Sequence, residues 1–207
     1  MASTIRPMGA ADIPAAFSVA KAAIHVTAAA DYSAWQCERW LEDYSPRPLA
    51  TALTAAATSP TAIALLVLVV EPGQPTGDGR AGDGGGGGDG EDGKSGRGGG
   101  AHGGNVIGGG RGDGGVVAGV VQVALRSPTT ATILGLFVHP AHGRRGYGSR
   151  LLTAAEGLAA AWGASRVRLR ASTTALALYR KRGYVVDAET RPGPPELGAE
   201  VPLQRRL

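Results

Sequence analysis

A glycine-rich tract in the middle of the chain restricts its fold more than any other sequence feature. Most of the 34 glycines in this chain of 207 residues lie between Gly73 and Gly115. The apolar residues of that tract are few, namely Ala81, Ala101, Val106 and Ile107. Ordering the tract would cost backbone entropy that so little apolar burial could not offset. We therefore predict one domain spanning 1–207, interrupted by a disordered insertion at about 73–115.

The segments on either side of the tract both have the composition of β-strands. Thr61–Glu71 and Val116–Arg126 are apolar and rich in β-branched residues. They can pair as a hairpin with the insertion at its tip. Closing a long loop adds little cost, because closure entropy grows only logarithmically with loop length.

The remaining sequence alternates between strand and helix patterns. Before the hairpin we expect a strand at Ile5–Pro7, a helix at Ile13–Ile24 capped by Asp12, a helix at Ala34–Leu41, and one or two helical turns at Leu49–Thr58. After it we expect a strand at Ala131–Val138, a helix at Ser149–Trp162, a strand at Arg166–Arg170, a helix at Thr173–Arg182, and strands near Tyr184–Ala188 and Glu200–Arg205. This alternation predicts a sheet covered by helices.

Composition argues against several classes of protein. Cys37 is the only cysteine, so an intrachain disulfide cannot form. The longest apolar run, Ala62–Val70, is far shorter than the ~20 residues that cross a bilayer, and no targeting signal is recognisable. We expect a cytoplasmic protein with no membrane partner.

The second half of the chain carries an excess of positive charge. Between His139 and Tyr184 there are nine Arg or Lys residues and one acid, Glu156. Such an excess indicates either an anionic partner or a solvated basic face. No nucleic acid partner is expected, because interleaved aromatic residues and a recognised nucleic-acid-binding fold are both missing.

The strongest functional signal lies in Leu136–Leu152, which runs from an apolar strand through a glycine-rich turn into an amphipathic helix. Gly146 and Gly148 allow the backbone to approach a ligand closely. The N–H groups at a helix start converge on an anion and carry roughly half a positive charge. A pyrophosphate group fits such a site.

Two common phosphate-binding loops do not match this segment. A Walker loop needs Lys before its final Ser or Thr, whereas this loop ends Gly146-Tyr147-Gly148-Ser149. A dinucleotide fingerprint has the order Gly-x-Gly-x-x-Gly, and here the glycines at 143, 146 and 148 are spaced differently. The next strand also carries arginines where a ribose-binding acid is expected.

The loop resembles the coenzyme A loop of the GCN5-related N-acetyltransferase (GNAT) family. That loop follows (Arg/Gln)-x-x-Gly-x-(Gly/Ala) after a strand ending in apolar-Val-x-Pro. Here Arg145, Gly146, Tyr147 and Gly148 fit, while the first position is Gly143 instead of Arg or Gln.

A second signature of the same family follows about 30 residues later, with the form Asn-x-x-Ala-x-x-(Leu/Phe)-Tyr-x-x-x-Gly-(Phe/Tyr). The matching residues are Ala175, Leu178, Tyr179, Gly183 and Tyr184. Ser172 stands in place of Asn. The resemblance covers nearly the whole chain except the insertion.

The resemblance implies an α/β (α+β) fold of the GNAT type. Its central mixed sheet would have about six or seven strands flanked by about four helices, in the order β-α-α-β-β-β-α-β-α-β-β. It also implies acetyl-CoA as cosubstrate, no metal, and transfer of acetyl to a primary amine of a small molecule or peptide by direct attack in a ternary complex. Such a protein is expected to be a monomer or homodimer.

The resemblance also assigns roles to individual residues. The expected coenzyme-binding residues are Leu136, Phe137, Val138, Arg144, Arg145, Gly146, Tyr147, Gly148, Ser149 and Ser172. Leu136–Val138 would splay from the neighbouring strand and offer backbone N–H groups to the pantetheine and the thioester carbonyl. Tyr179 would be the general acid that protonates the leaving thiolate.

The general base is not determined by the sequence. Many relatives carry Glu on the strand before the loop, but Thr130–Leu136 contains no carboxylate. The candidates are His25, Asp31, Glu42, Glu71 and His139, with loss of the proton to solvent as an alternative. Transfer of a longer acyl group and a catalytically silent acyl-CoA-binding module also remain open.

Overall fold

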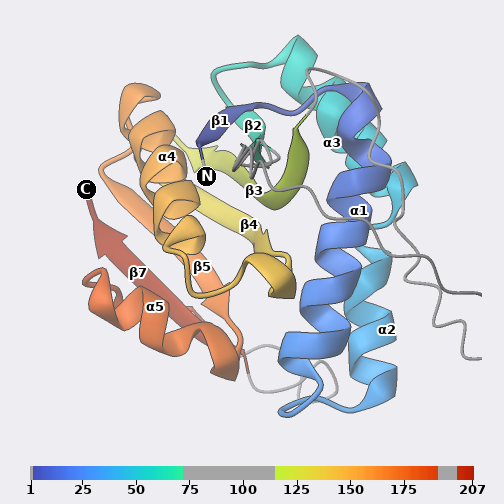
Figure 1. The fold of residues 1–207 in the computed structure, drawn as a ribbon. Coiled ribbons are helices and arrows are strands. Elements are labelled where there is room, and N and C mark those ends of the chain that lie inside the picture. The colour runs from blue at the N-terminus through green and yellow to red at the C-terminus, as the bar shows by residue number, and fades with distance from the viewer. Residues whose placement is uncertain (1, 72–114, 191–199) are drawn as a thin grey trace, which may run out of the picture. The chain divides into compact units, whose positions relative to one another are not determined.

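The computed structural model describes residues 2–71, 115–190 and 200–207, shown in Figure 1. The predicted insertion therefore lies, apart from Gly115, outside the described residues. The strands are β1 Ser3–Pro7, β2 Ile63–Val70, β3 Val116–Ser127, β4 Thr130–Val138, β5 Arg166–Ala171, β6 Val185–Val186 and β7 Val201–Arg206. The α-helices are α1 Ile13–Ala22, α2 Ala34–Glu42, α3 Pro46–Thr58, α4 Tyr147–Ala161 and α5 Leu176–Lys181.

Within these residues the strands form a seven-stranded mixed sheet in the order β1-β2-β3-β4-β5-β7-β6. Strands β1 to β4 are antiparallel neighbours, β4 and β5 are parallel, and β5, β7 and β6 are antiparallel again. Strand β2 pairs with β3 from Ile63 opposite Ala124 to Val70 opposite Val116. The predicted hairpin and the predicted fold class are both confirmed.

The sheet is covered on both faces, with α4 and α5 on one side and α1, α2 and α3 on the other (Figure 1). The position of β2 between two helical layers explains why its sequence is a continuous apolar run. Leu66 and Leu68 face the core beneath α4, while Leu65 and Val67 face the core beneath α1. Burial of each such side chain contributes roughly 1.5–3 kcal/mol, so a strand between two helical layers needs apolar residues at every position.

Several local predictions differ from the structure. Residues 49–58 belong to a full helix, α3, because Pro46 occupies its first turn and Leu49 is buried against the sheet side. The predicted second-half helix divides into a 3-10 turn, Thr173–Ala175, and the short α5. The strand expected at Tyr184–Ala188 contracts to the two residues of β6.

Asp12 was wrongly predicted to cap α1. A 3-10 turn, Ala10–Asp12, precedes the helix, and Asp12 itself has helical backbone angles. Its carboxylate therefore turns back to accept the Gly9 N–H at 2.8 Å and to pair with Arg6 at 2.7 Å. The bond from Arg6 holds the pKa of Asp12 below its usual range.

The pairing of β2 with β3 leads to a prediction about the insertion. Replacing 73–115 with Asn-Gly should raise the free energy of unfolding by up to about 2 kcal/mol, because each halving of loop length recovers about 0.6 kcal/mol. Urea unfolding measures the change. A variant carrying a Gly/Ser linker of the original length is the control and should match the parent. Failure of the shortened variant to fold would show that the segment packs against the domain.

Candidate active site

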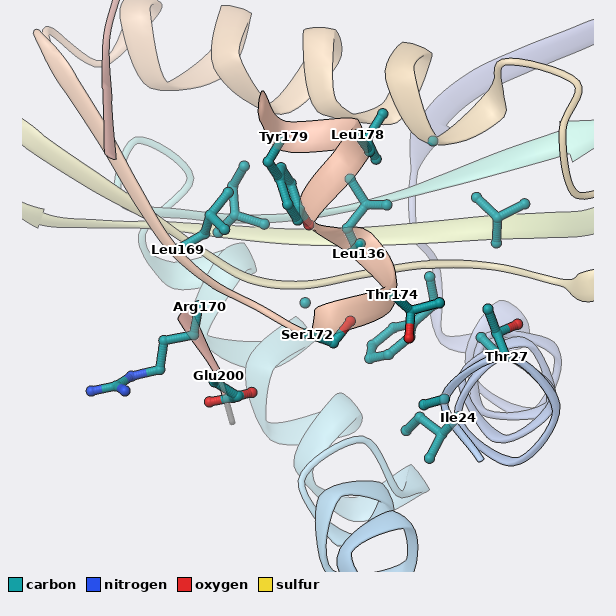
Figure 2. A pocket seen from close by; sticks show the side chains of 18 of the residues that line it. Ile24, Thr27, Leu136, Leu169, Arg170, Ser172, Thr174, Leu178, Tyr179 and Glu200 are labelled. Carbon is teal, nitrogen blue, oxygen red and sulfur yellow. The ribbon is translucent and has the colours of Figure 1, made fainter. Parts of the chain in front are cut away.

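A cavity of about 1070 Å³ lies where the sheet opens beside β4. Its walls come from the π-helical segment Ala23–Ala28 that follows α1, the end of α2, the second half of β4, the start of α4, the end of β5, α5 and Glu200 (Figure 2). This volume is at the upper end of the range for ligand sites. The cavity therefore has room for a large ligand that contacts several elements.

The cavity exists because β4 and β5 separate. Their pairing ends at Ile133 opposite Leu169, although β4 continues to Val138 and β5 to Ala171. This is the splay that the family resemblance implied. On its β5 side, the backbone of β4 beyond Ile133 is paired with no strand of the described residues and can hydrogen-bond to a ligand.

A β-bulge changes the direction of β4 just beyond Ile133, where its pairing with β5 ends. Gln122 of β3 lies opposite Gly135, but Val123 lies opposite Ile133, so Leu134 is the extra residue. The Tyr44 hydroxyl, from the turn after α2, donates a hydrogen bond to the Leu134 carbonyl. A Cβ on Gly135 would lie 2.5 Å from the Tyr44 ring. Glycine is needed there because the ring occupies the space of a side chain.

The loop after β4 presents unpaired amides. Arg144 and Gly146 both have left-handed backbone angles, with φ of 59° and 78°, and α4 starts at Tyr147. Arg150 donates its N–H to the Gly146 carbonyl at 3.1 Å, the first bond of the helical ladder. The amides of residues 147–149 precede it and have no intrahelical acceptor. Together with the positive end of α4 they form an anion-binding arrangement.

The structure brings nearly all of the predicted site residues to the cavity. The residues on its wall are Leu136, Phe137, Val138, Arg144, Gly146, Tyr147, Gly148, Ser149, Ser172 and Tyr179. Arg145 is exposed and is not among the residues that line the cavity. Tyr147 has its ring buried in the core, and Phe137 packs edge-on against Tyr44. These two residues therefore offer a ligand mainly their backbone.

Tyr179 reaches the cavity from α5. Its ring lies between Leu169 of β5 and Leu136 of β4 (Figure 2), and the side chain is only 5% exposed. No side chain or backbone group of the described residues bonds to its hydroxyl. Burial raises the pKa of Tyr179 to about 12, so the phenol is neutral at physiological pH. The hydroxyl therefore carries a proton that it can donate.

None of the five base candidates from the sequence lines the cavity. Asp31 accepts a hydrogen bond from the Thr174 hydroxyl at 2.8 Å, and Glu42 pairs with Arg39 at 2.5 Å. His25 lies 3.4 Å from Glu38. The His139 imidazole accepts the Ala141 N–H, and Glu71 is exposed beyond β2.

Three other carboxylates line the cavity: Asp43, Asp187 and Glu200. Asp187 is fully buried and is bound to Arg168 at 3.1 Å and to the Thr190 hydroxyl at 2.7 Å. No hydrogen bond or ion pair joins the carboxylate of Asp43 or of Glu200 to another described residue, although the charge of Arg170 lowers the pKa of Glu200. Sequence reasoning missed both because one follows α2 and the other precedes β7, and only the folded sheet brings them to one cavity.

The described residues include no group of three or more His, Cys, Asp or Glu placed to hold a metal ion. None of the helices among them is both long and apolar enough to span a bilayer.

The comparison with protein families agrees with this geometry. Residues 98–184, which include β3, β4, the loop and both helices α4 and α5, match the model of the acetyltransferase (GNAT) family. This match identifies a GNAT acetyltransferase domain at residues 98–184. Among curated proteins, none matches the sequence.

Solved GNAT structures share the fold at low sequence identity. The PaiA N-acetyltransferase of Thermoplasma acidophilum, in complex with coenzyme A, is 18% identical with a TM-score of 0.68, and all of both chains is covered. Ard1 of Thermoplasma volcanium is 19% identical with a TM-score of 0.60, covering 100% of this chain and 99% of that one. YncA of Salmonella typhimurium, with acetyl-CoA, is 18% identical with a TM-score of 0.55, covering 100% and 94%.

Proposed function

We propose that the cavity binds acetyl-CoA and that the protein transfers the acetyl group to a primary amine of a small molecule or peptide. One observation carries the proposal. A single cavity connects the unpaired amides of the α4 start, the unpaired edge of β4 and the unbonded hydroxyl of Tyr179. These are the three features that binding and cleavage of a coenzyme A thioester require.

The residues of the loop and of β4 fit the coenzyme. The amides of 147–149 and the side chain of Arg144 would hold the pyrophosphate, because both are positive and open to the cavity. The amides of Leu136–Val138 would bond to the pantetheine arm and polarise the thioester carbonyl. Structures of PaiA with coenzyme A and of YncA with acetyl-CoA support this assignment.

Tyr179 would supply the proton that the reaction consumes. Acetyl-CoA brings the acetyl group as an activated thioester, and the amine attacks its carbonyl carbon. The C–S bond breaks, the nitrogen loses one proton to solvent as the amide forms, and the Tyr179 hydroxyl donates its proton to the departing sulfur and is then reprotonated from solvent. Burial keeps the hydroxyl protonated before the reaction, so the proton is present when the thiolate forms beside it.

Release of free coenzyme A tests the proposal. The protein is incubated with acetyl-CoA and a panel of primary amines and peptides, and free thiol is measured over time. We expect amine-dependent release well above the rate without amine, with acetylated product confirmed by mass spectrometry. The same panel with longer acyl-CoA donors determines the acyl preference. Tight acetyl-CoA binding with no release for any amine would instead identify a catalytically silent acyl-CoA-binding module.

A further inference from the structure

Two hydrogen bonds join the segment before α2 to the turn that leads from β5 into α5. The Thr173 N–H donates to the Tyr32 hydroxyl at 3.1 Å, and the Thr174 hydroxyl donates to the Asp31 carboxylate at 2.8 Å. Each bond joins residues more than 140 positions apart in the sequence. Figure 2 shows Thr174 between the start of α5 and the segment that carries Ile24 and Thr27. We call this pair of bonds the bridge.

The Tyr32 side of the bridge is held firmly in place. The Tyr32 N–H donates to the Ala28 carbonyl at 3.0 Å, which closes a turn before α2. Ser33 and Gln36 then bond to each other reciprocally at the start of that helix. The Tyr32 side chain is only 7% exposed, and its ring packs against Trp40 with the ring centroids 5.6 Å apart. The Tyr32 hydroxyl therefore has a fixed position.

The α5 side of the bridge depends on this hydroxyl. Helix α5 has six residues, far fewer than the ~12 that an isolated helix needs to be even marginally stable. The 3-10 turn before it starts after Ser172, whose side chain makes no capping bond. The Thr173 N–H at this start has no acceptor within the turn itself. Tyr32 supplies that acceptor, so the bridge fixes the start of the segment that carries Tyr179.

The position of α5 determines where the Tyr179 hydroxyl lies. The Tyr179 ring is packed between Leu136 and Leu169 (Figure 2), and no hydrogen bond from another described residue holds its hydroxyl. Proton transfer to a leaving sulfur requires hydrogen-bond distance. A shift of about 1 Å in a catalytic group can lower the rate by about a hundredfold. Loss of the bond at the start of α5 should therefore affect the reaction.

We propose that Tyr32 is a positioning residue, and that its bond to the Thr173 N–H holds α5 where the Tyr179 hydroxyl can protonate the leaving sulfur. The inference rests on the proposed acetyl transfer and adds a residue to it. Tyr32 is not among the residues that line the cavity, so it acts through α5 and not on the substrates.

Tyr32→Phe tests this role. The substitution keeps the ring and its contact with Trp40 and removes only the acceptor of the Thr173 N–H. We expect kcat to fall by about tenfold to hundredfold. The KM values for acetyl-CoA and the amine should change little, because the residues that line the cavity stay the same. A change confined to the KM of the amine would make Tyr32 part of the acceptor site and would overturn the proposal.

A double variant decides whether Tyr32 acts through Tyr179. When Tyr32→Phe is added to Tyr179→Phe, kcat should fall no further, because the hydroxyl that the bridge positions is already gone. Two residues that act independently give losses that multiply. A double variant whose loss is the product of the two single losses would therefore overturn the proposal.

Tyr184→Phe is the matched control. It also removes the hydroxyl of a buried tyrosine, and the bond that it breaks, to Glu156 at 3.1 Å, does not belong to the bridge. Its kcat should be that of the parent. An equal fall in Tyr184→Phe and Tyr32→Phe would show that kcat responds to any loosening of the core, and the specific role of Tyr32 would be lost.

Hydrogen exchange provides a readout that needs no turnover. The backbone amides of residues 173–181 should exchange faster in Tyr32→Phe than in the parent, and unchanged exchange would overturn the proposal. Absence of amine-dependent coenzyme A release in the parent would instead contradict the proposed function, whatever the exchange shows. If Tyr32→Phe does not fold, Thr174→Val replaces it in the same measurements. That variant removes only the exposed bond to Asp31, so the same changes should appear at smaller size.

Discussion

Tyr179→Phe is expected to lower kcat by about 10²- to 10⁴-fold, nearer the lower value, with coenzyme affinity little changed. The substitution keeps the ring and its packing between Leu136 and Leu169 and removes only the proton donor. The lower value is expected because the coenzyme thiol is a fair leaving group even when it departs without a proton. Steady-state kinetics on a true acceptor, together with acetyl-CoA binding, measure both quantities.

Tyr184 provides the control, because the same substitution, Tyr→Phe, can be made there. The centroids of the Tyr179 and Tyr184 rings are 5.6 Å apart. Its hydroxyl donates to Glu156 at 3.1 Å in a buried cluster with Arg182 and Arg205. Tyr184→Phe should therefore lower the free energy of unfolding by about 1–3 kcal/mol, the cost of leaving a buried charged acceptor short of one bond. Its kcat should be that of the parent. Tyr179→Phe breaks no such bond and should retain its stability.

The pH dependence follows from the raised pKa of Tyr179. A pKa of about 12 keeps the hydroxyl protonated below that value, so the donor form is fully present across the range of about pH 6–10. The deficit of Tyr179→Phe should then be constant over this range. Parent rates in Tyr179→Phe at every pH would show that water protonates the thiolate.

The coenzyme loop could be predicted from the sequence because its signal is local. A strand, a turn with Gly146 and an amphipathic helix follow one another within about 30 residues, and each has its own residue pattern. The pairing of β2 with β3 was predictable for a related reason. Two apolar segments of matching length flank a tract that cannot be part of the core.

The part of the cavity lined by Tyr44 and Glu200 could not be predicted because its contacts are distant in the sequence. Tyr44 bonds to Leu134, 90 residues away, and fixes the bulge that directs β4. Glu200 enters the cavity only because β7 pairs with β5 out of sequence order. No residue pattern near Glu200 distinguishes it from an ordinary charged residue before a strand.

The prediction that Asp12 caps α1 was wrong because an Asp at this position has two possible local hydrogen-bonding arrangements. An Asp before a helix can cap it or can bond to the preceding turn. Arg6 on β1 decides between them for Asp12, since it binds the carboxylate at 2.7 Å, and the Gly9 N–H of the preceding turn bonds to the same group. The hydrogen bonding of Asp12 therefore depends on the position of β1, and the residue pattern of the helix carries no information about that position.

Gly146→Val is expected to lower coenzyme affinity at least tenfold, which is a change of about 1.4 kcal/mol. A Cβ at Gly146 would meet no protein atom within 4 Å, so steric conflict inside the protein is not the cause. The cause is the backbone angle φ of 78°, which a β-branched residue adopts only at a cost of roughly 1–2 kcal/mol. Relief of that strain would turn the following amides away from the anion.

Gly157→Val is the matched control for this prediction. Gly157 lies in the middle of the same helix, is exposed, has ordinary helical geometry, and would also place a Cβ in open space. The change removes a helix-interior glycine, so the free energy of unfolding should stay the same or rise slightly, with coenzyme affinity unchanged. Calorimetric titration with acetyl-CoA and urea unfolding are measured on both variants. Parent affinity in a folded Gly146→Val protein would mean that the pyrophosphate does not bind at the start of α4, and the site would have to be placed elsewhere in the cavity.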